Sequence, residues 1–268
     1  MCKERMLDGI KDTFYIPLAA RIYASKRFSE FFYDKKALSL ESYIPTNSIN
    51  QNSNEYFHMA SVCRQKTIDE KTIKFLKDNP YGNVVYLGAG IETAYYRIGN
   101  KTANFYQIDL PDVIEIRKKF LGERDNEQLI AGDMFALNWL KEIDITLPTL
   151  IVAAGVYQYF AESKIIELVK AMKAQILHGE LIFDATNSKG LKLANKYVRK
   201  TGNINAQMYF SVDDPKEFAK RTNSKLLEVD GFFQGALKDC RGLKLITRIY
   251  MYFADRCKRT LVLHLKLN

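Results

Sequence analysis

The chain of 268 residues is long enough for one large α/β domain, or for one domain with a cap. Its hydrophobic content of 47% and charged content of 26% are those of a folded protein and exclude wholesale disorder. The net charge of +9 predicts a basic surface. Because lysine and arginine are spread along the chain rather than clustered, a nucleic-acid partner is not indicated.

Segments typical of a signal peptide or a membrane helix are not found in the sequence. Residues 1–14 carry scattered charges and no apolar core, and the longest apolar run, residues 150–159, is too short to span a bilayer. We therefore expect a cytoplasmic protein without a membrane partner. Nothing in the sequence predicts the oligomeric state.

The cysteines and histidines are isolated in the sequence and form no pair with metal-ligand spacing. We expect free thiols and no bound metal. A serine hydrolase is not supported either, because the chain contains no G-x-S-x-G motif. The isolated residues are Cys2, Cys63, Cys240, Cys257, His58, His178 and His264.

Residues 1–80 contain no convincing strand and are predicted to form a helical cap. Apolar residues recur at helical spacing in two stretches, residues 21–32 and 54–78. Between them, residues 42–55 are rich in Asn and Ser, which is typical of a loop. The turn residues 79–82 end the helical region.

Residues 81–268 alternate between buried strands and amphipathic helices, which predicts a doubly wound, mostly parallel α/β sheet. The last third, where a late strand pair flanks a helical stretch, predicts an antiparallel end to this sheet. Predicted strands are residues 83–90, 104–110, 128–133, 149–155, 179–186, 224–233 and 260–268. Predicted helices are residues 91–99, 111–121, 162–177, 191–200, 213–222 and 242–257.

Glycines and acids follow the first strands of this sheet. Gly88 and Gly90 end the first strand, where glycine lets a ligand approach the backbone. Taken alone, this turn also suits a strand–helix connection without a ligand. Asp109 ends the second strand, where a carboxylate can accept hydrogen bonds from both ribose hydroxyls. Together they predict a nucleotide-like ligand.

Two features favour S-adenosylmethionine over NAD as that ligand. The dinucleotide fingerprint requires a third glycine at the start of the helix, where this chain has Thr93. After the third strand come Gly132, Asp133 and Met134, a carboxylate beside an apolar side chain that suits the amine and ring face of adenine.

With these motifs the chain resembles the leucine carboxyl methyltransferase family, which includes protein-phosphatase carboxyl methyltransferases and polyketide O-methyltransferases. The resemblance runs from about residue 20 to residue 165, and LGAGIETAYYR followed by IDLP is its most distinctive part. It implies the class I methyltransferase fold, Rossmann-like, with a seven-stranded sheet. The matching stretches are ASKRFSEFFYDKKA, the helix that contains Arg64, VVYLGAGIETAYYR, FYQIDLPDV, GDM and LIVAAGVYQYF.

The resemblance implies which residues bind the methionyl part of S-adenosylmethionine. Arg64, with Lys26 as a second candidate, would bind the methionyl carboxylate from the cap. An Arg fork suits this role because it binds a carboxylate bidentately; without the resemblance, a solvated helix charge would be the simpler reading of Arg64. Gly88, Ala89 and Gly90 would contact the methionine chain.

The resemblance also assigns the nucleoside contacts. Asp109, with Leu110 beside it, would bind the ribose, and Asp133 with Met134 would bind the adenine.

The turn after the fourth strand departs from the family pattern. The family usually has an acid there, whereas this chain has Ala153, Ala154 and Gly155. Ala154 and Gly155 are still expected to contact the cofactor, with an altered affinity or substrate choice.

The expected activity is methyl transfer to oxygen, with S-adenosylhomocysteine as the product of the cofactor. A small-molecule hydroxyl or carboxylate is the expected acceptor, and a protein C-terminus is the alternative. An inactive relative that binds cofactor or RNA is a third possibility. No catalytic base is predicted, since Tyr157 and Tyr159 fit aromatic packing better than contact with an acceptor.

Overall fold

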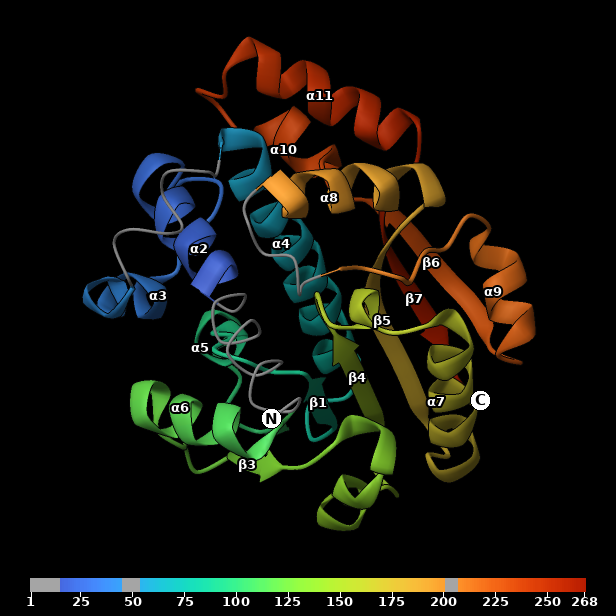
Figure 1. Ribbon diagram of the computed structural model, residues 1–268. Coiled ribbons are helices and arrows are strands. Elements are labelled where there is room, and N and C mark those ends of the chain that lie inside the picture. Colours follow the sequence, from blue (N-terminus) through green and yellow to red (C-terminus); the bar gives the residue numbers. More distant parts are fainter. Residues whose placement is uncertain (1–14, 45–53, 201–206) are drawn as a thin grey trace, which may run out of the picture.

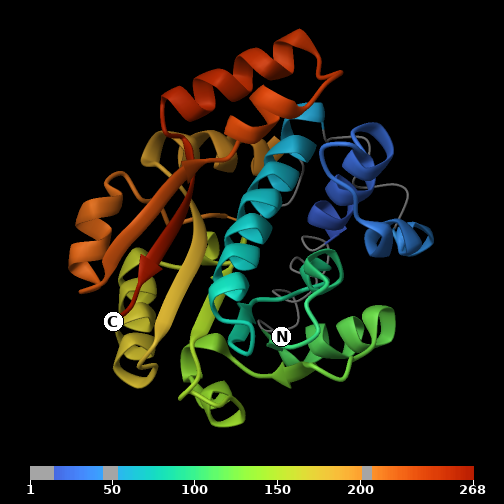
Figure 2. The same ribbon diagram turned by 180° about the vertical axis from the view of Figure 1, so that it is seen from behind.

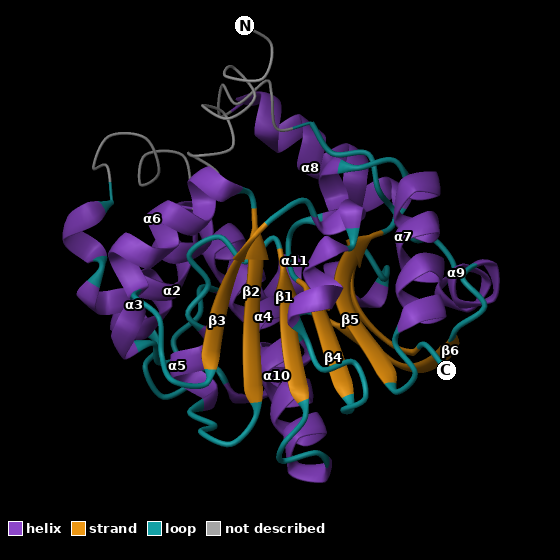
Figure 3. Ribbon diagram, turned by 90° about the horizontal axis from the view of Figure 1, so that it is seen from below, coloured by secondary structure: helices purple, strands orange, loops and turns teal. Residues whose placement is uncertain are grey.

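In the computed structural model, which describes residues 15–44, 54–200 and 207–268, seven strands form one sheet in the order β3-β2-β1-β4-β5-β7-β6 (Figures 1 and 3). Neighbouring strands are parallel, except that β7 runs antiparallel to both β5 and β6. The predicted doubly wound, mostly parallel sheet with an antiparallel end is confirmed. The strands are β1 (Asn83–Leu87), β2 (Asn104–Asp109), β3 (Glu127–Ala131), β4 (Thr149–Ala153), β5 (Gly179–Thr186), β6 (Lys225–Gly231) and β7 (Thr260–Lys266).

The central strands are apolar on both faces because helices cover both. Every residue of β1 and β4 is buried, as expected for strands with near-continuous apolar sequence at a sheet centre. Strand β6, at the edge, instead alternates between exposed and partly buried positions.

Helices α7 and α9 pack on one face of the sheet, and α4 with α2, α10 and α11 packs on the other. Figure 2 shows α4 crossing the second face of the sheet. The helices are α2 (Tyr15–Arg27), α3 (Lys35–Ser39), α4 (Glu55–Asp78), α5 (Ala94–Ile98), α6 (Pro111–Leu121), α7 (Glu162–Gln175), α8 (Ser188–Lys200), α9 (Pro215–Arg221), α10 (Gln234–Asp239) and α11 (Leu245–Arg256). Short 3₁₀ helices are η1 (Glu41–Tyr43), η2 (Met134–Ala136), η3 (Asn138–Glu142) and η4 (Tyr157–Tyr159).

Helix α4 begins where the Asn54 side chain accepts a hydrogen bond from the backbone N–H of Phe57. Along its length it buries Val62, Ile68 and Phe75 in the same core cluster as residues of the sheet. The proposed boundary at residue 80 therefore runs between a helix and a strand that share one core. Residues 1–14 of the predicted cap, and residues 45–53 of the predicted loop at residues 42–55, lie outside the described residues.

The helix predicted at residues 91–99 is shorter than expected, because α5 begins only at Ala94. The backbone carbonyls of Gly90 and Glu92 are occupied by the Arg117 side chain, which donates to them at 3.2 and 2.8 Å. These contacts hold residues 88–93 as a loop before the helix begins. Two short helices, α3 and α10, are not predicted from the sequence.

Within the described ranges, none of the helices combines the length and the apolar character that a bilayer crossing requires.

Candidate functional site

The carboxyl ends of β2, β1 and β4, which are adjacent in the sheet, bring together the sequence motifs. The Gly88–Gly90 loop follows β1, Asp109 is the last residue of β2, and Gly155 lies just after β4. In an open parallel sheet this edge is the usual place for ligand binding.

Asp109 is held in place by the backbone around it. One carboxylate oxygen accepts a hydrogen bond from the N–H of Gly90 at 2.7 Å, and the other accepts from the N–H of Leu110 at 2.8 Å. Burial raises the pKa of Asp109, and the two amide donors oppose that rise. Since each oxygen has a further lone pair, the fixed carboxylate can still accept hydrogen bonds from two neighbouring hydroxyls.

The loop after β1 depends on glycine at position 88. Gly88 has a φ of +65°, in the left-handed region, and a Cβ there would lie 2.6 Å from Cγ2 of Val156. The loop after β4 therefore packs directly on the loop after β1. Ala89, between the two glycines, is buried at 5% exposure.

Asp133 and Met134 follow β3 but face different surroundings. The exposed Asp133 side chain accepts a hydrogen bond from the N–H of Phe135 at 2.9 Å, which caps η2. Met134 is buried in the core cluster, and its carbonyl accepts a hydrogen bond from the indole of Trp139. The adenine roles given to this pair remain predictions.

Arg64 points from α4 to the turn after β4. A Cβ on Gly155 would lie 2.8 Å from Nη1 of Arg64, and that same nitrogen lies 3.2 Å from the Asp184 carboxylate on β5. Lys26 is not brought to this group. Its half-exposed side chain pairs with Glu41 at 2.5 Å.

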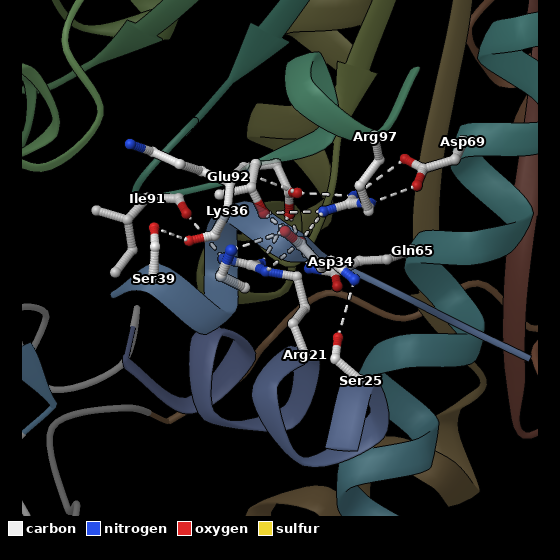
Figure 4. A network of polar contacts seen from close by, with 12 residues as sticks. Arg21, Ser25, Asp34, Lys36, Ser39, Gln65, Asp69, Ile91, Glu92 and Arg97 are labelled. Carbon is white, nitrogen blue, oxygen red and sulfur yellow. Dashed lines mark hydrogen bonds and ion pairs between the residues drawn. The ribbon is translucent and has the colours of Figure 1, made fainter. Parts of the chain in front are cut away.

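A buried charge network joins the N-terminal helices to the glycine loop (Figure 4). Arg97 binds Asp69 of α4 through two nitrogens, at 2.7 and 3.1 Å, and also lies 2.7 Å from Asp34 and 2.8 Å from Glu92. Arg21 of α2 adds a contact to Glu92 at 3.1 Å. The network thus fixes α2, α4 and the residues before α3 to the loop that follows β1.

The network shifts the pKa values of two of its carboxyl groups in opposite directions. Burial alone would raise the pKa of Glu92, but Arg21 and Arg97 together hold it at about 2. Burial raises the pKa of Asp69 to about 6 in spite of the contact with Arg97.

The sequence pattern does not reveal this network, although most of its members stand in the stretches that carry the family resemblance. Asp34 lies in ASKRFSEFFYDKKA, and Glu92 and Arg97 lie in LGAGIETAYYR. The available signal was Glu92 and Arg97, the two charged residues of an otherwise uncharged motif.

Tyr157 packs in the core, as expected, where its ring lies 5.5 Å from that of Phe183 and 6.1 Å from that of Phe210. Among the described residues, no cluster of three or more His, Cys, Asp or Glu side chains is arranged to hold a metal ion.

Solved structures share this arrangement of sheet and helices. A protein from Thermobifida fusca matches with a TM-score of 0.60 at 15% identity, over 92% of this chain and 93% of that chain. A DUF574 family protein from Streptomyces avermitilis matches with a TM-score of 0.56 at 10% identity, over 92% and 96%. Geranyl diphosphate methyltransferase in complex with S-adenosylmethionine matches with a TM-score of 0.52 at 11% identity, over 82% and 94%. The fold is that of the class I S-adenosylmethionine-dependent methyltransferases.

Sequence comparison narrows the class to a family. Residues 10–173 match the leucine carboxyl methyltransferase family, and the chain belongs to that family. It is 27% identical over 161 residues to the tetracenomycin polyketide synthesis O-methyltransferase TcmP of Streptomyces glaucescens. That match covers 59% of this chain and 58% of the relative, so it spans little more than half of the curated protein's length. The family resemblance seen in the sequence is confirmed.

Proposed function

We propose that this protein is an S-adenosylmethionine-dependent O-methyltransferase whose acceptor is the hydroxyl or carboxylate of a small molecule. The observation that carries the proposal is the Asp109 carboxylate, fixed by the amides of Gly90 and Leu110 beside the glycine loop, in a chain of the leucine carboxyl methyltransferase family. The polyketide O-methyltransferase relative supports a small-molecule acceptor.

The side chains at the strand ends fit the polar groups of S-adenosylmethionine. Asp109 supplies two oxygens for the ribose hydroxyls, and Asp133 is an exposed carboxylate for the adenine amine. Arg64 keeps its Nε buried without a hydrogen-bond partner among the described residues. That spare donor suits a carboxylate such as that of the methionyl group.

When bound, S-adenosylmethionine supplies a methyl group on a positively charged sulfur. The residues of this chain then have to orient the cofactor and exclude water, because an in-line displacement depends mainly on alignment. Arg64 would hold the methionyl carboxylate and Asp109 the ribose, and the sulfur lies between these two groups in the cofactor. The buried network of Arg21, Glu92 and Arg97 keeps the N-terminal helices against this loop.

The acceptor determines whether a base is needed. A carboxylate with a pKa of about 4 is already ionised at neutral pH, whereas a phenol with a pKa of about 10 benefits from a base. No residue is assigned as a base, so an acid acceptor requires the fewest assumptions about this site.

A methyl-transfer assay with tritiated S-adenosylmethionine and a panel of phenols, carboxylic acids and C-terminal peptides tests the proposal. Methyl esters release labelled methanol in mild base, whereas aryl methyl ethers do not, so this treatment separates the two acceptor classes. Label on a small molecule supports the proposal, and label on peptides alone would favour the protein C-terminus. Binding of S-adenosylhomocysteine without transfer to any acceptor in the panel would favour an inactive relative.

A further inference from the structure

Asp184 lies on β5 at the level where β4 ends. Ala153, the last residue of β4, pairs with Phe183, which puts Asp184 next to Ala154 across the two strands. Side chains alternate along a strand, and Phe183 belongs to the core cluster opposite α4. Asp184 therefore faces α4, and a carboxylate is present beside the position where the family's acid is replaced by Ala154.

Asp184 contacts both the turn after β4 and the side chain of Arg64. One oxygen accepts a hydrogen bond from the N–H of Gly155 at 2.5 Å, and the other lies 3.2 Å from Nη1 of Arg64. Both side chains are nearly buried, with Arg64 at 11% and Asp184 at 8% exposure. A cation and an anion thus stand side by side at the sheet edge.

This pair matches the charges of an α-amino acid. Such a group carries an ammonium and a carboxylate on one carbon, so its two charges also lie side by side. The guanidinium of Arg64 has an unused Nε, and each oxygen of Asp184 has a further lone pair. The pair can accept the amino acid with both charges matched.

A ligand carboxylate alone would fit the pair badly. If Arg64 turned its hydrogen bonds to such a ligand, Asp184 would remain as a nearly buried carboxylate with less compensation, which is unfavourable. An ammonium group on the same ligand would replace the positive charge and the hydrogen bond that Asp184 loses when Arg64 turns to the ligand. The arrangement therefore favours a zwitterion over a simple carboxylate.

We propose that Asp184 binds the α-ammonium group of the methionyl part of S-adenosylmethionine, while its ion-pair partner Arg64 binds the carboxylate. This rests on the proposed function and adds the residue that selects the zwitterionic cofactor. It also explains how the site can lack an acid at Ala154, because the neighbouring strand supplies one.

Binding of three compounds to the wild type and to Asp184→Asn, measured by calorimetry, tests the proposal. The compounds are S-adenosylhomocysteine, its deaminated analogue in which hydrogen replaces the amino group, and 5′-methylthioadenosine, which has no amino-acid part. The wild type should prefer S-adenosylhomocysteine over the deaminated analogue by roughly 10- to 150-fold. Asp184→Asn should bring this ratio close to one and leave the affinity for methylthioadenosine within about threefold, on the scale of a tenfold change per 1.4 kcal/mol.

Methylthioadenosine binding also reports whether Asp184→Asn is folded. The matched control is Asp144→Asn, an exposed aspartate in the loop before β4, which should keep the wild-type ratio. If Asp184→Asn does not fold, a wild-type ratio near one still refutes the proposal.

Two results would overturn the proposal while leaving the proposed function intact. One is a wild type that binds S-adenosylhomocysteine and its deaminated analogue equally. The other is an Asp184→Asn variant that weakens both compounds equally, which would mean that Asp184 only positions Arg64. A wild type that binds none of the three compounds would instead refute the proposed function, and this assignment with it.

Discussion

Arg117 and Glu127 form an ion pair of 2.9 Å in which neither side chain is exposed to solvent. The same guanidinium donates to the carbonyls of Gly90 and Glu92, so one residue of α6 holds both β3 and the loop after β1. The conformation of the candidate site is thus supported by a fully buried charge.

Breaking this pair should destabilise the protein strongly. Glu127→Gln leaves the Arg117 charge buried without its partner, and we expect a loss of about 3–5 kcal/mol in the free energy of unfolding. Urea denaturation followed by circular dichroism measures it. The control is Glu115→Gln, an exposed position on α6, which should change the free energy by less than about 0.5 kcal/mol. Equal stability of both variants would show that the pair contributes nothing.

Asp109 should govern nucleoside affinity. Asp109→Ala removes two hydrogen bonds to ribose, worth about 2–3 kcal/mol, and should weaken S-adenosylhomocysteine binding by a factor of roughly 30 to 150. Because burial raises the pKa of Asp109, wild-type affinity should also decline as the pH falls through that raised value. Calorimetry at several pH values checks both effects. The exposed neighbour Asp112 gives the control variant Asp112→Asn, and wild-type affinity in folded Asp109→Ala would exclude ribose contact.

Gly88→Ala should disturb the contact between two loops. The new Cβ would lie 2.6 Å from Cγ2 of Val156 in a backbone conformation with φ of +65°, so we expect a loss of stability of at least about 1–2 kcal/mol. Adding Val156→Ala should recover only part, since the Cβ of Val156 would still be 2.9 Å away. The control is Gly132→Ala, which meets nothing within 4 Å. Thermal melts with equal midpoints for the Gly88 and Gly132 variants would contradict the geometry.

Asp255 should make stability depend on pH. Burial raises its pKa from 3.8 to about 6, with the Phe233 amide opposing the rise. The folded protein therefore holds this proton more tightly than the unfolded chain does. The stabilising contribution is complete below about pH 4 and is lost as the pH rises through about 6.

The Asp255→Asn variant isolates this effect, because its side-chain oxygen can still accept from Phe233. We expect it to be more stable than the wild type by about 1–3 kcal/mol at pH 7.5, with little difference near pH 4. Urea denaturation at both pH values measures this difference in the free energy of unfolding. Asp239→Asn, at an exposed position on α10, should show no such gap, and a pH-independent difference for Asp255→Asn would refute the assignment.

The sequence predicted the sheet because its strands are short apolar runs that alternate with amphipathic helices. Residues 149–155 are apolar enough to predict a strand at the sheet centre, and residues 179–186 predict a further strand; the structure confirms both strands and the central place of the first. The helix predicted at residues 91–99 was too long, because periodicity does not show that Arg117 donates hydrogen bonds to the backbone carbonyls of Gly90 and Glu92. Propensity is local, whereas this contact joins residues far apart in the chain.

The candidate site was predicted only in part for the same reason. Asp109 and the glycines lie at strand ends, which sequence patterns locate well. The partnership of Arg64 with Asp184 depends on how α4 crosses the sheet, and their separation along the chain hides it. Lys26 stands in a matching motif, yet its pairing with Glu41 is likewise set by tertiary packing.

The place of β7 between β5 and β6 has a consequence for synthesis on the ribosome. Strand β5 is complete at Thr186, but the strand that pairs with its outer edge begins only at Thr260. While the intervening residues emerge, that edge, which includes the apolar Leu181 and Phe183, stays unpaired, and β6 has no neighbour at all. An open apolar edge readily pairs with other chains. Until β7 has emerged, the nascent chain therefore carries an edge that is prone to aggregation, and we expect a chain cut short before residue 260 to keep it.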